Sequence, residues 1–96
     1  MQRPDDDAQK MADLQAFIDA AAAQLHIEPP FDETARDGIL GLTGRAAHGI
    51  VRPAAPIASL MVGYLVGSGR AASWTDATEQ VKRLVRDHAD QGRDDR

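Results

Sequence analysis

The most apolar part of this 96-residue chain reads IASLMVGYLV, from Ile57 to Val66. It is about ten residues long, whereas a helix needs roughly 20 apolar residues to span a membrane. Pro53 and Pro56 precede this stretch at positions that suit the first turn of a helix, and Gly67-Ser68-Gly69 follows it. A helix that is apolar nearly all round belongs at the centre of a helical bundle. We therefore expect a buried central helix here.

Amphipathic patterns predict three further helices. The first runs from about residue 9 to 26, ends before Pro29 and Pro30, and carries an apolar stripe of Met11, Leu14, Ile18, Ala21 and Leu25. The second begins after Asp32 as N-cap and ends at Gly49 in a left-handed cap. Its apolar face holds Ala35, Ile39, Leu42 and Ala46, and its other glycines either soften the helix or let another helix approach closely: Gly38, Gly41 and Gly44.

The last helix begins at Ser73, with Asp76 three residues later in a capping-box arrangement. Its predicted apolar stripe consists of Trp74, Ala77, Val81, Leu84, Val85 and His88. The fold class is therefore all-α: a compact bundle of about four helices with the nearly all-apolar third helix at the centre. We expect a disordered N-terminus at 1–8, a helical domain at 9–89 and a disordered tail at 90–96, where charged residues occur without apolar ones.

Composition excludes several classes of function. Eleven Lys and Arg against fifteen Asp and Glu give a formal charge of -4, whereas proteins that bind nucleic acid usually present a basic face. The absence of cysteine excludes disulfides, thiolate metal sites and cysteine nucleophiles. The polar first residues do not resemble a signal peptide. We expect a soluble cytoplasmic protein that binds neither nucleic acid nor a membrane.

Motifs for catalysis or cofactor binding are not convincing. Residues 67–72 fit G-x-G-x-x-A, but a dinucleotide site requires a second strand, and only a helix and a polar tail follow. A helix-turn-helix DNA reader needs polar side chains on its second helix, and here that helix is apolar. His26, His48 and His88 are scattered, without carboxylates at metal-ligand spacing, so we expect no metal, no cofactor and no catalytic residue.

The charge pattern points to one candidate site. Between Gly38 and Thr75 the chain has three arginines and no acid. His48 and Arg52 mark the turn before the third helix, and a helix N-terminus can bind an anion. The predicted anion- or partner-binding residues are His48, Arg52, Arg45 and Pro53. The alternative is a purely structural turn, in which His48 caps the second helix. In that case the segment between Gly38 and Thr75 lacks acidic residues because most of it belongs to the core.

The stretch Ala46-Ala47-His48-Gly49-Ile50-Val51-Arg52-Pro53-Ala54-Ala55-Pro56-Ile57 resembles the signature of a small actinobacterial family of unknown function. Members of that family occur alone or as C-terminal extensions of molybdenum cofactor guanylyltransferases, which join GMP to molybdopterin. The similarity extends over about 80 residues of helical pattern. It implies a link to molybdenum cofactor biosynthesis, with such a nucleotidyltransferase as partner.

Two functions remain open at this point. The first is a non-catalytic accessory module that docks onto the nucleotidyltransferase through the His48–Arg52 turn. The second is a self-associating structural protein without a ligand, whose dimer interface is the glycine face of the second helix or an exposed Trp74. A small enzyme using His48 as acid or base is a third option, and it lacks a nearby nucleophile.

Overall fold

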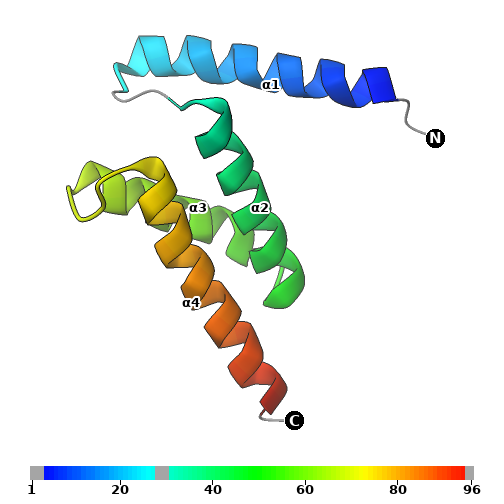
Figure 1. The fold of residues 1–96 in the computed structure, drawn as a ribbon, viewed down its shortest axis with the longest axis vertical. Helices are drawn as coiled ribbons and strands as arrows, with labels where there is room; N and C mark the ends of the chain where they lie inside the picture. Colours follow the sequence, from blue (N-terminus) through cyan, green and yellow to red (C-terminus); the bar gives the residue numbers. More distant parts are fainter. Residues whose placement is uncertain (1–3, 28–30, 95–96) are drawn as a thin grey trace. The chain divides into compact units, whose positions relative to one another are not determined.

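The computed structural model describes residues 4–27 and 31–94, and it confirms the all-α class (Figure 1). Four helices follow one another along the chain: α1 (Pro4–Leu25), α2 (Glu33–Gly49), α3 (Ala54–Gly67) and α4 (Trp74–Asp94). No strand occurs in these two described ranges. Within them, no helix is long and apolar enough to cross a membrane.

Two helices extend further than the sequence pattern predicts. α1 begins at Pro4 and not near residue 9, because proline suits the first helical position and Asp5, Asp6 and Asp7 carry the charge that a helix N-terminus favours. α4 continues to Asp94 beyond the predicted limit at 89, since an established helix gains one hydrogen bond for each residue added. The rest of the two predicted disordered ends, 1–3 and 95–96, lies outside the described residues.

The chain divides into two compact units, with the boundary between Glu33 and Thr34. The first unit contains α1, which ends in a left-handed residue, His26, with φ of 55°. The backbone N–H of Ile27 donates to the Ala22 carbonyl at 3.0 Å, and that of His26 donates to Ala23 at 3.4 Å. These two bonds form a Schellman motif, so His26 is the residue that ends α1.

The same motif ends α3. Gly69 has φ of 79°, the N–H of Arg70 donates to the Leu65 carbonyl at 2.9 Å, and the N–H of Gly69 donates to Val66 at 3.2 Å. The prediction that Gly67-Ser68-Gly69 ends the helix is confirmed. Gly69 is the residue that allows the turn, because a side chain disfavours this left-handed conformation.

We expect Gly69→Ala to lower the free energy of unfolding by about 1 kcal/mol, because alanine is strained at positive φ. Gly67→Ala is the matched control: this glycine is helical and an added Cβ would meet nothing within 4 Å, so its variant should keep or slightly raise stability. Urea unfolding followed by circular dichroism measures both. Equal stability of the two variants would contradict the assigned role of Gly69.

The N-cap predicted at Ser73 is confirmed, because the N–H of Asp76 donates to Ser73 Oγ at 3.0 Å. The return bond differs from that of a capping box: Asp76 Oδ2 accepts from the N–H of Ala72, one residue before the N-cap, at 3.2 Å. The left-handed cap predicted at Gly49 is wrong. Gly49 is the last residue of α2 and has no positive φ, and the N–H of Ile50 continues the helical pattern by donating to Ala46 at 3.1 Å.

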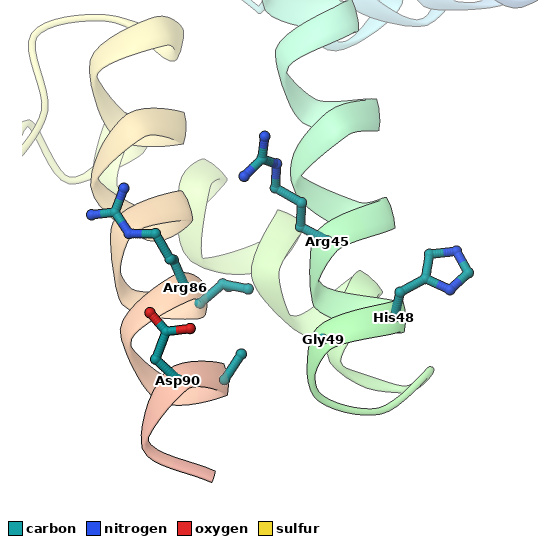
Figure 2. A pocket seen from close by; sticks show the side chains of 7 residues that line it. Arg45, His48, Gly49, Arg86 and Asp90 are labelled. Carbon is teal, nitrogen blue, oxygen red and sulfur yellow. The ribbon is translucent and has the colours of Figure 1, made fainter. Parts of the chain in front are cut away.

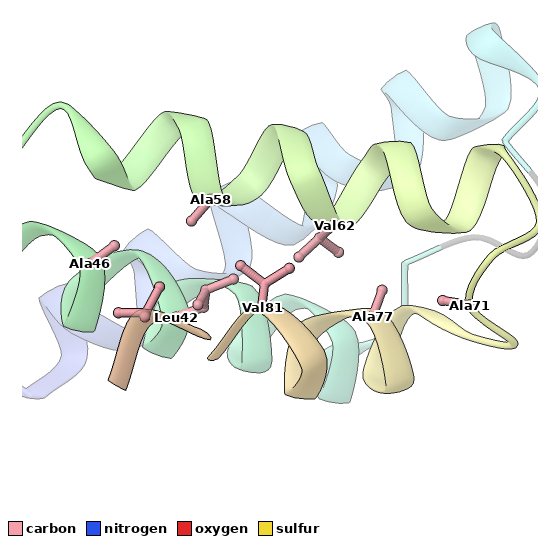
Figure 3. Packing of buried hydrophobic residues seen from close by; sticks show 8 residues of the cluster. Leu42, Ala46, Ala58, Val62, Ala71, Ala77 and Val81 are labelled. Atoms are coloured by element: carbon pink, nitrogen blue, oxygen red, sulfur yellow. The ribbon is translucent and has the colours of Figure 1, made fainter. Parts of the chain in front are cut away.

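The core of the second unit joins α2, α3, α4 and the turn before α4 (Figure 3). Leu42 and Val62 are its largest fully buried side chains. The other buried residues of this cluster are all alanines or valines: Ala46, Ala58, Ala71, Ala77, Val81 and Val85. Trp74 is half-buried against this cluster, so the prediction of an exposed Trp74 is wrong. Small side chains let the helices pack closely but leave a core of limited volume.

α2 and α4 lie alongside each other and run in the same direction (Figure 1). A Cβ built on Gly38 would lie 3.5 Å from Thr78 Cγ2, and one on Gly49 would lie 3.5 Å from Ala89 Cβ. Both contacts advance in the same sense along the two helices, which makes them parallel. An added Cβ on Gly38 would make only an ordinary van der Waals contact with α4, and Gly41 and Gly44 face open space, so the approach of α4 does not require glycine at any of these three positions.

α3 and α4 leave large apolar side chains uncovered. α3 buries Ala58 and Val62, yet Leu60 is 68% exposed and Tyr64 60%. On α4 the predicted burial of Leu84 and His88 is wrong, since Leu84 is 64% exposed and His88 is exposed as well. The buried line of α4 is Ala77, Val81 and Val85, at spacings of four. A helix turns about 100° per residue, so Leu84 and His88 lie beside that line and not on it.

Candidate functional site

A shallow cavity of about 380 Å³ lies between the C-terminal halves of α2 and α4 (Figure 2). α2 contributes Arg45, His48 and Gly49, and α4 contributes Val85, Arg86, Ala89 and Asp90. Gly49 and Ala89 bring the two backbones close together, because neither has a side chain beyond Cβ. Longer side chains stand above this contact and form the cavity walls.

A second cavity, of about 430 Å³, adjoins the first and shares Arg45 and Arg86 with it. Its other lining residues, Glu79, Lys82 and Arg83, all belong to α4. We call the two cavities together the α2–α4 groove. It carries four cations, Arg45, Lys82, Arg83 and Arg86, against two carboxylates, Glu79 and Asp90. The groove is therefore net positive in a chain whose formal charge is -4.

The carboxylates nearby compensate these cations only weakly. Lys82 Nζ lies 3.8 Å from Glu79 Oε1, and Arg86 Nε lies 3.8 Å from Asp87 Oδ1; such long, solvated pairs contribute little. Among the side chains that the structure describes, no carboxylate lies within 4.0 Å of Arg45 or Arg83. Two guanidinium groups on facing helices are thus available to an anionic group.

The predicted site residues fall into two places. Arg45 and His48 line the groove, and Figure 2 shows the His48 ring pointing away from α4, so its backbone shapes the wall more than its imidazole does. Arg52 and Pro53 belong to the exposed turn between α2 and α3 and line neither cavity. The structure therefore joins Arg45 to α4 and leaves Arg52 outside the groove.

The start of α3 offers few backbone donors to an anion. The N–H of Ala54 donates to the Val51 carbonyl at 3.0 Å, and the N–H of Ala55 donates to Arg52 at 3.1 Å. Pro53 and Pro56 have no N–H to offer. These turn bonds occupy the amides that the helix N-terminus would otherwise present, so the side-chain cations of the groove are the better anion-binding groups.

Sequence reasoning missed the contribution of α4. The signal was present, because Lys82 and Arg86 are four residues apart and therefore share a helix face, with Arg83 beside them. What the sequence lacked was the partner helix: nothing in it shows that this face of α4 lies beside Arg45. The sequence pattern therefore pairs Arg45 with Arg52, which lies in the same acid-free segment of the chain.

The arrangement suits binding more than catalysis. Among the described residues no group of three His, Asp or Glu side chains could hold a metal ion. His48 is exposed, and no described nucleophile or carboxylate is hydrogen-bonded to it. The arginine side chains on the two helices instead present planar guanidinium groups, each with several N–H donors that can bind a carboxylate or a phosphate through two hydrogen bonds.

Comparison with known proteins gives one family match. The model of a domain of unknown function, DUF6457, matches residues 9–93, a range that includes most of α1 and the whole of α2 and α3. The chain belongs to the DUF6457 family. No curated protein and no solved structure matches it. Membership of a family of unknown function is thus established, and the groove of this DUF6457 domain lies entirely within the matched range.

Proposed function

We propose that this DUF6457 domain is a non-catalytic cytoplasmic accessory module that docks onto a molybdenum cofactor guanylyltransferase. The partner is suggested by the resemblance of the stretch from Ala46 to Ile57 to a family found as an extension of such enzymes. The observation that carries the docking role is the α2–α4 groove, with Arg45 and Arg83 on facing helices and without a described carboxylate partner.

The groove favours an acidic surface of the partner. Four cations lie within two adjoining cavities. The ion pairs of Lys82 with Glu79 and of Arg86 with Asp87 are 3.8 Å long, so these two cations can form closer pairs with a carboxylate of the partner. Complementary charge at an interface mainly accelerates encounter and selects the partner, and it weakens as salt rises. A module of this kind needs no catalytic group of its own.

Binding between the purified full-length chain and the guanylyltransferase of the same organism tests this proposal. We expect the double variant Arg45→Glu with Arg83→Glu to bind roughly 100-fold more weakly, because each reversal at an interface costs about 1.4 kcal/mol or more. Raising the salt concentration should weaken binding of the wild type and have much less effect on the variant.

Two charge reversals outside the groove serve as controls. Arg70 lies in the turn after α3. Arg70→Glu should leave the affinity for the guanylyltransferase within a factor of about three of the wild-type value, because a charge far from the interface is largely screened by salt. Arg52→Glu separates the groove from the His48–Arg52 turn. An affinity loss confined to Arg52→Glu would overturn the groove assignment, and the absence of any binding by the wild type would overturn the choice of partner.

A further inference from the structure

A second groove, on α3 and α4, differs from the first in being wholly apolar. It encloses about 400 Å³ and is lined by Leu60, Met61, Tyr64, Leu65, Val81 and Leu84. Leu60, Tyr64 and Leu84 are each 60% or more exposed. None of its lining residues belongs to the α2–α4 groove, so the two surfaces are distinct. We call it the apolar groove.

From this surface we propose that a second copy of the chain covers the apolar groove, through the same face, in a two-fold symmetric dimer. An isologous interface requires a surface that can face itself, and apolar side chains meet this requirement because they carry no sign of charge. α3, from Ala54 to Gly67, contains no charged residue at all. Two copies can therefore bring their α3 helices together without like-charge repulsion, although each chain has a formal charge of -4.

The available area is sufficient for a dimer. Ile57 and Met61, 50% and 48% exposed, extend the face formed by Leu60, Tyr64 and Leu84. With roughly 150–250 Å² for a large side chain, the exposed parts of these five residues amount to on the order of 500 Å² per copy. Complete burial of these parts in both copies would remove about 1,000 Å² from solvent, which is the lower bound for a specific interface. An exposed apolar patch of this size is at the upper end of what a monomer presents, and such patches often mark interaction sites.

The edge of the apolar groove carries a charged group. At one edge of the groove the Arg70 guanidinium lies 5.6 Å from the centre of the Tyr64 ring, which leaves a charged group at the rim and an apolar centre.

The molar mass of the full-length chain in solution tests the proposal. Sedimentation equilibrium up to millimolar concentration should give the mass of two chains. Leu60→Glu should raise the dissociation constant at least about tenfold, because it places a charge in the centre of the buried patch. Val51→Glu is the matched control, since Val51 is also an exposed apolar residue but belongs to the α2–α3 turn. The dimer of the Val51→Glu variant should have the same dissociation constant as the wild-type dimer.

Cross-linking gives a second measurement that does not depend on how well the glutamate variant folds. The chain has no cysteine, so a single introduced thiol can pair only with its copy in another chain. Under mild oxidation Leu60→Cys or Tyr64→Cys should form a covalent dimer in high yield, and Val51→Cys should not. The dimer should also persist in Arg45→Glu with Arg83→Glu, which separates this proposal from the docking function.

Three results would overturn the proposal. One is a wild-type mass equal to a single chain at all concentrations, which is the outcome expected if α1 of the same chain or a different protein covers the groove. Another is an equal change of the dissociation constant in Leu60→Glu and Val51→Glu. The third is cross-linking at Val51→Cys with none at Leu60→Cys or Tyr64→Cys.

Discussion

Leu42→Ala should unfold a large part of the second unit at room temperature. Leu42 has 0% of its surface exposed and, with Val62, is one of the two largest fully buried side chains among the residues that the structure describes. Removing three buried carbons from a leucine costs about 2–5 kcal/mol, including the cavity left behind. A domain of this size is rarely stabilised by more than about 3–5 kcal/mol. The substitution therefore removes most of the free energy that keeps α2, α3 and α4 together.

Trp74 makes this effect measurable. It is the only tryptophan of the chain and packs against the core of the second unit, so its fluorescence reports unfolding of that unit. The matched control is Leu40→Ala, two residues earlier on the same helix, where the side chain is 44% exposed and the expected loss is below about 1 kcal/mol. If both variants unfolded at the same urea concentration, the assignment of Leu42 to the core would be wrong.

Ala77→Asp should be at least as disruptive as Leu42→Ala. Ala77 has 0% of its surface exposed, in the first turns of α4, and its neighbours in the core are apolar. An unpaired carboxylate at this position either loses its hydration or forces α4 away from α3, and the cost is several kcal/mol. We expect the variant to lose the cooperative unfolding transition of Trp74 fluorescence, with much of its helical signal in circular dichroism.

Thr75→Asp is the control for charge and helix position. Thr75 is exposed, two residues before Ala77 and nearer the start of α4, where a negative charge interacts favourably with the helix dipole. Its stability should match or slightly exceed that of the wild type. A similar loss in both variants would show that the new carboxylate acts through its charge alone and that burial of Ala77 is unimportant.

Local signals in the sequence predicted most of the helices because the interactions behind them are local. The N-cap at Ser73 and the glycine turn at Gly69 each involve atoms only a few residues apart. The local signal failed at Gly49. A glycine at this position is typical of a left-handed cap, yet Gly49 continues α2, and the N–H of Ile50 donates to the Ala46 carbonyl in the helical pattern.

The candidate site was only half accessible to such reasoning. Arg45 and His48 were identified from their own segment, whereas Lys82, Arg83 and Arg86 join them only because α2 and α4 lie parallel. Arg52 was chosen because it is close in sequence, but it belongs to a different surface of the same unit. Proximity in sequence and proximity in space coincide within one helical turn and separate beyond it.

By itself the sequence determined the all-α class, the order of the four helices and the way α3 and α4 begin or end, since helix periodicity and caps are properties of short segments. Only the tertiary structure decided which apolar side chains are buried. The stretch from Ile57 to Val66 is apolar on every side, so hydropathy alone predicts burial all round. In the second unit only α2 and α4 share a core with it, and this leaves Leu60 and Tyr64 exposed. Burial depends on how many neighbouring helices cover a face, which no segment specifies alone.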